Sequence, residues 1–328
     1  MSVLIDSHGR RISNLRVSVT DRCNFRCVYC MPGEGIPWIP RAELLRYEEI
    51  TRLVRIFASL GVSRIRLTGG EPLLRRDLPV LVRQLAGVEG IRDLTMTTNG
   101  FFLVDAADGL YEAGLHRMNV SLDSLDAVRF ARLVRRDAFD QVMAGVEAAV
   151  RLPFRCVKIN VVIIRGFNDD EILTFAEMAR GRAVQVRFIE FMPMGADDGW
   201  ARERVVPGEE IRRRIGARYP LVRADTDRDH PAEVYTFEDG RGEVGFIDSV
   251  TSPFCDGCNR VRITADGMFQ TCLFALSETD LKSPLRDGAG DTAIADIIRR
   301  AVRAKERGHL INKDSFARPG RTMSQVGG

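Results

Sequence analysis

Between residues 12 and 190, short stretches of alternating apolar and polar residues are separated by stretches with helical periodicity. In residues 12–20, Leu15 and Val17 alternate with polar residues, which predicts a strand. In residues 48–60, apolar residues recur every three or four positions and Gly61 follows, as expected where a helix ends. The same two patterns predict five further strands, at 64–68, 93–98, 117–122, 157–164 and 184–189, and four further helices, at 78–85, 105–112, 139–150 and 170–178.

Six strands separated by helices favour a parallel sheet with right-handed crossovers. The predicted fold is therefore α/β, an incomplete (βα)6 barrel of the TIM type. After residue 195 the pattern changes to short strands joined by Asp/Gly turns, at 221–224, 233–237, 242–247 and 260–264. We expect two domains, a barrel at 1–195 and a β-rich region at 196–328 that ends in two glycines.

Unusual polar residues follow the predicted strands. The first strand leads into a cysteine cluster, and the others lead into residues 68–72, 97–100, 121–123 and 190–193. Because the ends of parallel strands meet at one edge, these loops should form a single rim, where such folds place their chemistry.

The charge balance bounds the function. The chain has 328 residues, with 48 basic and 45 acidic residues and a net charge of +3, which argues against nucleic acid as a main partner. No apolar run reaches membrane-spanning length, and the N-terminus lacks a signal-peptide pattern. A cytoplasmic location is expected, where thiols stay reduced and available to metals.

Six of the seven cysteines form two triads, and Cys156 alone is expected to be a small core residue. Cys23, Cys27 and Cys30 lie within eight residues, a spacing that suits an iron–sulfur cubane with one iron left open. Zinc is the alternative, although it usually takes four N/S ligands in paired form and His8 is badly spaced.

The second triad is Cys255, Cys258 and Cys272, and a zinc ribbon fits its spacing equally well. No Cys or His lies between Cys258 and Cys272, and His230 and His309 could serve as a fourth ligand only by folding back. A cubane with an open iron is therefore the other interpretation. Arg260 and Arg262 would project from one face of the predicted strand and could bind a polyphosphate. The alternative is an ordinary solvated strand face.

The first triad resembles the signature of the radical S-adenosylmethionine superfamily in the segment 23–30, Cys-Asn-Phe-Arg-Cys-Val-Tyr-Cys. The segment 69–72, Gly-Gly-Glu-Pro, resembles the second hallmark of those enzymes, beside the methionine end of the cofactor. The resemblance implies that an open iron binds S-adenosylmethionine and that its one-electron cleavage gives a 5′-deoxyadenosyl radical.

A closer resemblance covers residue 15 to the end. Residues 254–267, 271–274 and the tail 323–328 look like those of the GTP 3′,8-cyclase family, lyases of molybdenum cofactor biosynthesis. It implies two 4Fe–4S clusters, conversion of GTP to (8S)-3′,8-cyclo-7,8-dihydroguanosine 5′-triphosphate, and a tail that reaches the active site. It also implies an external flavodoxin- or ferredoxin-type electron donor and transfer of product to cyclic pyranopterin monophosphate synthase; a homodimer is possible.

Roles follow from the resemblance, residue by residue. The two triads hold the clusters, and S-adenosylmethionine contacts Tyr29, Gly70, Ser121 and Met192. GTP contacts Arg16, Arg66, Thr97, Lys158, Arg260 and Arg262. The catalytic residues are Arg260, Arg262, Gly327 and Gly328.

Three blander interpretations stay open at this point. Met192 could be a packed core side chain, and Thr97 and Ser121 could be turn residues. The chain could instead be a two-cluster enzyme that modifies peptides, or a non-catalytic iron–sulfur or zinc module.

Overall fold

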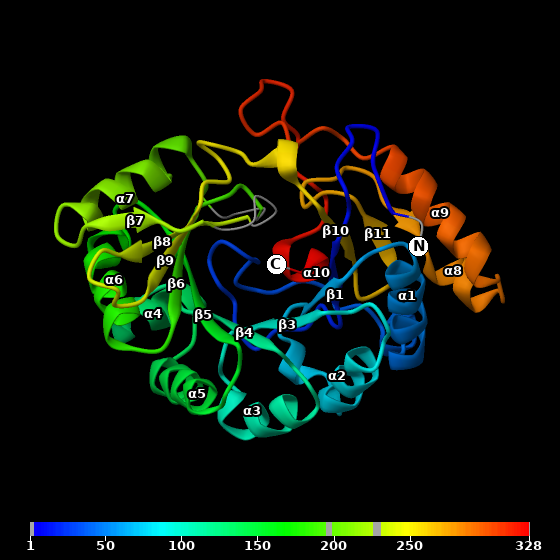
Figure 1. Ribbon diagram of the computed structural model, residues 1–328, viewed down its shortest axis with the longest axis horizontal. Coiled ribbons are helices and arrows are strands. Elements are labelled where there is room, and N and C mark those ends of the chain that lie inside the picture. The colour runs from blue at the N-terminus through cyan, green and yellow to red at the C-terminus, as the bar shows by residue number, and fades with distance from the viewer. Residues whose placement is uncertain (1–2, 195–198, 226–230, 328) are drawn as a thin grey trace.

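The computed structural model describes residues 3–194, 199–225 and 231–327, and its strands form one twelve-stranded sheet. The central strands are the six predicted ones, each parallel to the next. They are β1 (Asn14–Ser18), β2 (Arg64–Thr68), β3 (Asp93–Thr98), β4 (Arg117–Ser121), β5 (Cys156–Ile163) and β6 (Gln185–Glu190). The sheet bends into an arch that surrounds an interior space (Figure 1). The predicted open α/β barrel is thus confirmed.

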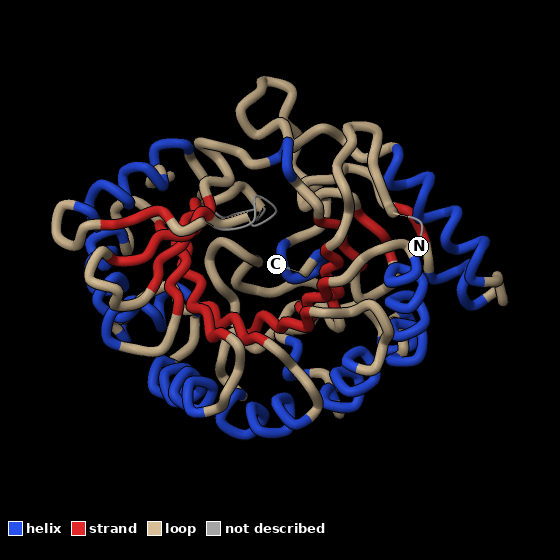
Figure 2. The backbone as a smooth tube through the Cα atoms, viewed as in Figure 1, coloured by secondary structure: helices blue, strands red, loops and turns tan. Residues whose placement is uncertain are grey.

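Helices cover the outer face of the arch (Figure 2). The five predicted helices are present as α1 (Tyr47–Ser59), α2 (Leu78–Ala86), α3 (Leu103–Glu112), α5 (Phe139–Arg151) and α6 (Ile172–Gly181). One further helix, α4 (Ala127–Val134), was not predicted; Asp126 caps its N-terminus by accepting a hydrogen bond from the Arg129 N–H. Short 3-10 turns occupy Arg41–Glu43, Pro72–Leu74, Asp169–Glu171, Arg202–Arg204 and Cys255–Gly257.

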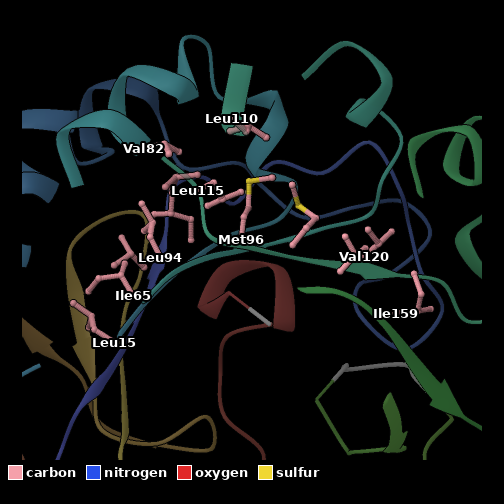
Figure 3. Packing of buried hydrophobic residues seen from close by; sticks show 14 of the residues in the cluster. Leu15, Ile65, Val82, Leu94, Met96, Leu110, Leu115, Val120 and Ile159 are labelled. Carbon is pink, nitrogen blue, oxygen red and sulfur yellow. The ribbon is translucent and has the colours of Figure 1, made fainter. Parts of the chain in front are cut away.

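Alternation along each strand decides which side chains face the helices. Leu15, Ile65, Leu94 and Val120 point outward and are buried beneath the helices, as Figure 3 shows. The residues between them are mostly polar and face the interior. In a filled barrel the interior is apolar. Here the main core lies between the strands and the outer helices, and a smaller apolar cluster forms around Met194, Phe274 and Val326. The inward face of the central strands is left for something polar.

The C-terminal region extends the same sheet. Its strands are β7 (Leu221–Arg223), β8 (Glu233–Phe237), β9 (Glu243–Ile247), β10 (Arg260–Ile263), β11 (Met268–Gln270) and β12 (Thr279–Asp280). Strand β9 pairs in parallel with β6, and β10 pairs in parallel with β1, so the region lengthens the arch at both ends.

The description of this region as β-rich is incomplete, because it also contains four helices. They are α7 (Gly208–Gly216), α8 (Lys282–Arg286), α9 (Asp291–Arg303) and α10 (Met323–Val326). The sheet runs through both predicted domains, and the boundary at residue 195 stays a prediction. No helix in the described ranges has the length and apolar content to cross a membrane.

Candidate active site

A cavity of about 280 Å³ lies inside the arch and opens to solvent. Both cysteine triads line it, and all six thiols are free. Segments at opposite ends of the chain therefore face one space, because β10 lies beside β1 in the sheet.

The loop of the first triad is fixed against the end of α4. The backbone N–H groups of Arg26 and Val28 donate to carbonyls of the last two residues of that helix, each at 3.0 Å. Burial raises the pKa of the Cys23 thiol to about 11 and that of Cys30 to about 12. The bare thiols are therefore protonated at neutral pH, and a bound metal has to displace their protons.

The glycine-rich loop after β2 runs directly beside the chain that precedes Cys23. Gly70 donates its N–H to the Thr20 carbonyl at 2.7 Å, and Glu71 donates to the Arg22 carbonyl at 2.7 Å. A side chain at position 70 would clash with that Arg22 carbonyl. Glycine is required because the two loops approach at backbone distance.

Two buried carboxylates tie the rim loops together. Glu71 accepts hydrogen bonds from the Thr98 hydroxyl and the Asn99 N–H, each at 2.7 Å, and burial raises its pKa to about 7. Asp123 accepts from the Tyr29 hydroxyl at 2.6 Å and from the Val162 N–H at 2.7 Å, and burial raises its pKa to about 6. The sequence placed both acids in rim loops but assigned them no role.

The second triad lies in electropositive surroundings. The Arg260 guanidinium donates to the Cys258 sulfur at 3.5 Å. Lys305, which is buried, donates to the carbonyls of Arg260 and Thr271. Burial alone would raise the pKa of Cys258, but Arg260 and Lys305 lower it to about 7. A thiolate forms more easily here than in the first triad.

Neither triad is arranged for a single ion. No three His, Cys, Asp or Glu side chains in the described ranges could hold one metal ion together. The thiolates of a cubane each bind a different iron and need not converge on a point. Three thiols in each triad fit a cluster with one open iron. At the second triad His309 also lines the cavity, its backbone is hydrogen-bonded to Cys255, and its Nδ1 is buried without a hydrogen-bond partner.

Three arginines stand in a row across neighbouring strands. Arg262 of β10 is in register with Arg16 of β1, which is in register with Arg66 of β2. The Nε atoms of Arg16 and Arg66 are buried without a hydrogen-bond partner. Burial, followed by repulsion from neighbouring arginines, lowers the pKa of Arg66 to about 10 and of Arg262 to about 9. A bound anion would relieve both effects.

Two more cations lie on the opposite strands. Arg187 is buried on β6 and lines the cavity, and burial lowers its pKa to about 9. It was not predicted, although its position between the outward-facing Val186 and Phe188 is the signal for an inward side chain. Lys158 donates to the Gln185 side chain at 2.8 Å and lines a small adjoining pocket, which it shares with Arg16, Arg66, Arg187 and Arg260.

The remaining predicted site residues gather in or beside the cavity. Tyr29, Gly70, Thr97, Ser121, Met192, Arg260 and Arg262 line it. The Gly327 carbonyl accepts a hydrogen bond from Arg262, and α10 brings the tail into the arch (Figure 1). Gly328 lies outside the described residues. Cys156, expected in the core, is partly exposed.

Comparisons with known proteins agree with this geometry. Residues 17–179 match the Radical SAM superfamily, and residues 184–311 match the family described as Molybdenum Cofactor Synthesis C. The fold resembles the crystal structure of Streptococcus suis SuiB bound to S-adenosylmethionine, with a TM-score of 0.61, 13% identity, and coverage of 95% of this chain and 76% of that one. The protein is thus a radical S-adenosylmethionine enzyme.

Full-length relatives define it further. The GTP 3′,8-cyclase of Pelotomaculum thermopropionicum is 47% identical over 326 residues, 98% of this chain and 99% of the relative. The mitochondrial GTP 3′,8-cyclase of Arabidopsis thaliana is 44% identical over 329 residues. That alignment covers 99% of this chain and 84% of the Arabidopsis protein. The chain belongs to the GTP 3′,8-cyclase family.

Proposed function

We propose that this chain cyclises GTP in the cavity between the two cysteine triads. The reaction converts GTP to (8S)-3′,8-cyclo-7,8-dihydroguanosine 5′-triphosphate, a step of molybdenum cofactor biosynthesis. The enzyme is a lyase that uses S-adenosylmethionine and an iron–sulfur cluster. The domain at 1–195 would supply the cofactor site, and the region at 196–328 would complete the substrate site.

Cys23, Cys27 and Cys30 would hold the cluster that binds S-adenosylmethionine. When bound, this cluster would supply the electron for the reductive cleavage of S-adenosylmethionine, and the radical chemistry belongs to the cofactor. The protein's own part is to orient the cofactor. Gly70 lets its loop approach closely, while Tyr29, Ser121 and Met192 line the wall around it.

Cys255, Cys258 and Cys272 would hold a second cluster, whose open iron would supply a binding position for the guanine of GTP. Three observations support this proposal: all three thiols face the cavity, a fourth Cys or His ligand is absent from residues 259–271, and the pKa of Cys258 is lowered. The alternative zinc ribbon would need a fourth ligand, for which His309 beside Cys255 is the candidate.

The arginine row is the observation that best supports GTP as the substrate. Arg262, Arg16 and Arg66 lie side by side and form no ion pair within the described residues, although Asp93 lies near Arg66; Lys158 adjoins them. A triphosphate would supply that charge and accept bonds from the buried Nε atoms. Arg260 stands between the row and the second triad, and Thr97 lines the wall nearby.

Arg260, Arg262, Gly327 and Gly328 are the proposed catalytic residues. Arg262 donates to the Gly327 carbonyl, so the tail and the substrate would meet at this guanidinium. An external electron donor of flavodoxin or ferredoxin type, a downstream cyclic pyranopterin monophosphate synthase and a homodimer complete the proposal.

Anaerobic turnover with S-adenosylmethionine, dithionite and GTP, followed by mass spectrometry, tests this function. We expect 5′-deoxyadenosine together with a cyclised isomer of GTP. If 5′-deoxyadenosine forms and GTP is unchanged, the assignment of GTP as the substrate is wrong. Iron analysis tests the cluster count, since two cubanes need about eight irons per chain and one needs about four. Cys258→Ser should lose about half of the iron, whereas Cys156→Ser should lose none.

A further inference from the structure

The first cysteine loop and the end of α4 beside it carry several arginines. Residues 22–35 and 132–137 contain five arginines and two acidic residues, Glu34 and Asp137. In the described part of the chain, none of the five forms an ion pair. The net charge of these two segments therefore equals the +3 of the whole chain. We call the five residues the basic collar: Arg22, Arg26, Arg132, Arg135 and Arg136.

The collar lies directly on the loop of the first triad. The Arg136 guanidinium donates to the Asn24 carbonyl at 3.2 Å. The Arg135 guanidinium lies so close to Gly33 that a side chain there would meet it at 2.7 Å. Both arginines remain exposed to solvent. A protein bound to the collar would thus be one chain thickness from the cysteines.

Backbone and ring contacts set the positions of these side chains. Arg135 has a φ of 56°, a left-handed conformation that glycine usually occupies after a helix and that costs another residue about 1–2 kcal/mol. Arg136 stacks 4.2 Å above the Phe101 ring, which packs edge-on against Phe25 at 6.0 Å. Phe25 belongs to the cysteine loop, so two rings join the surface to the cluster site.

We infer that the basic collar is the docking surface for an acidic electron-carrier protein. This inference rests on the proposed function, which needs electrons from outside the chain. One electron would leave the carrier, which is oxidised, and reduce the first cluster; no covalent bond or proton is involved. A patch of unpaired positive charge speeds the encounter with an acidic partner and orients it.

The experiment compares two reductants in the same holoenzyme. The double variant Arg135→Glu/Arg136→Glu reverses two exposed charges, and the control Arg55→Glu/Arg303→Glu reverses two on α1 and α9, on the other side of the arch from α4 (Figure 1). Formation of 5′-deoxyadenosine is measured with dithionite and with increasing concentrations of a reduced acidic flavodoxin. We expect the collar variant to need about tenfold more flavodoxin at low salt, with its dithionite rate within twofold of the wild type. The control should match the wild type with both reductants.

Equal flavodoxin dependence in the collar variant, the control and the wild type would overturn the inference. If the double variant also loses its dithionite rate, the single variant Arg135→Glu, which keeps the Arg136 contacts, replaces it. Its flavodoxin dependence is then compared with that of the wild type in the same way. Because the experiment measures cleavage of S-adenosylmethionine, its result does not depend on whether GTP is the substrate. A wild type that cleaves the cofactor without cyclising GTP contradicts the proposed function and leaves the docking test valid.

Discussion

The Tyr29 hydroxyl donates a 2.6 Å hydrogen bond to Asp123, and this bond joins the first cysteine loop to the end of β4. Asp123 is buried, and its second bond comes from the Val162 N–H on β5. Three segments of the rim are therefore held by one carboxylate.

Tyr29→Phe should remove this bond and leave one acceptor of Asp123 without a partner. The expected loss in the free energy of unfolding is about 1–3 kcal/mol, together with weaker binding of S-adenosylmethionine. Urea unfolding and calorimetric titration measure the two effects. Val28→Ala, in the same loop, leaves the hydrogen bond intact and serves as the control. If both variants lose the same stability and the same cofactor affinity, the hydrogen bond contributes to neither.

Gly70→Ala should displace the chain ahead of Cys23, because the new methyl group clashes with the Arg22 carbonyl. We expect a destabilised protein that retains less iron. Gly181→Ala, at the end of α6 in open space, should be neutral or slightly stabilising. Iron content and melting temperature report both, and a Gly70→Ala protein with full iron would refute the close approach.

Lys158 should make GTP binding dependent on pH. Burial, followed by repulsion from Arg187, lowers its pKa to about 7, so at pH 8 it is mostly neutral in the free enzyme. A bound triphosphate favours the charged form, so binding should take up a proton and weaken as pH rises from about 7 to 9. Calorimetry in buffers of different ionisation enthalpy measures this uptake. In Lys158→Met this proton uptake should vanish. If the uptake persists in the variant, another group takes up the proton.

Glu190→Gln should destabilise the loop that leads to the second triad. Glu190 is buried at the end of β6 and accepts N–H bonds from Gly208 at 3.0 Å, Val250 at 2.7 Å and Thr251 at 2.8 Å. An amide group faces those donors with an N–H₂, at a cost of about 2–4 kcal/mol. Urea unfolding tests this. Glu238→Gln, on an exposed turn, should change stability by less than about 0.5 kcal/mol.

Arg262→Ala should lower kcat/KM for GTP by about 10- to 150-fold, since charge-assisted hydrogen bonds contribute about 1.5–3 kcal/mol each. Arg262→Lys should recover little, because an ammonium lacks the planar fork. Binding of S-adenosylmethionine to both variants should stay within twofold of the wild type. A parallel loss of cofactor binding would mean that Arg262 maintains the shape of the cavity and does not bind GTP directly.

The alternating pattern predicted the six central strands because an outward apolar residue and an inward polar one follow each other closely, as Leu15 and Arg16 do. The same pattern gave no role to Arg187, since a lone arginine between Val186 and Phe188 also suits a solvated strand. Helix α4 escaped prediction because it is only eight residues long, although Phe130, Leu133 and Val134 follow helical spacing and are buried.

Relations between distant segments could not be predicted from single stretches. The row of Arg262, Arg16 and Arg66 exists because β10 returns to pair with β1, and no local pattern encodes that pairing. Lys305 likewise reaches the second triad from the end of α9. The cysteine motifs were recognisable because their spacing is local.

The inverted alternation of the strands, with apolar residues outward and cations inward, links the survival of this protein to its supply of nucleotide. The arginines of the row lie side by side, so a nucleotide bound at the proposed site would relieve their repulsion. A free GTP concentration of one hundred times the dissociation constant would add about 2.7 kcal/mol to the free energy of unfolding. In a cell short of GTP the enzyme would unfold more often and be degraded sooner, so its abundance would follow the substrate it consumes.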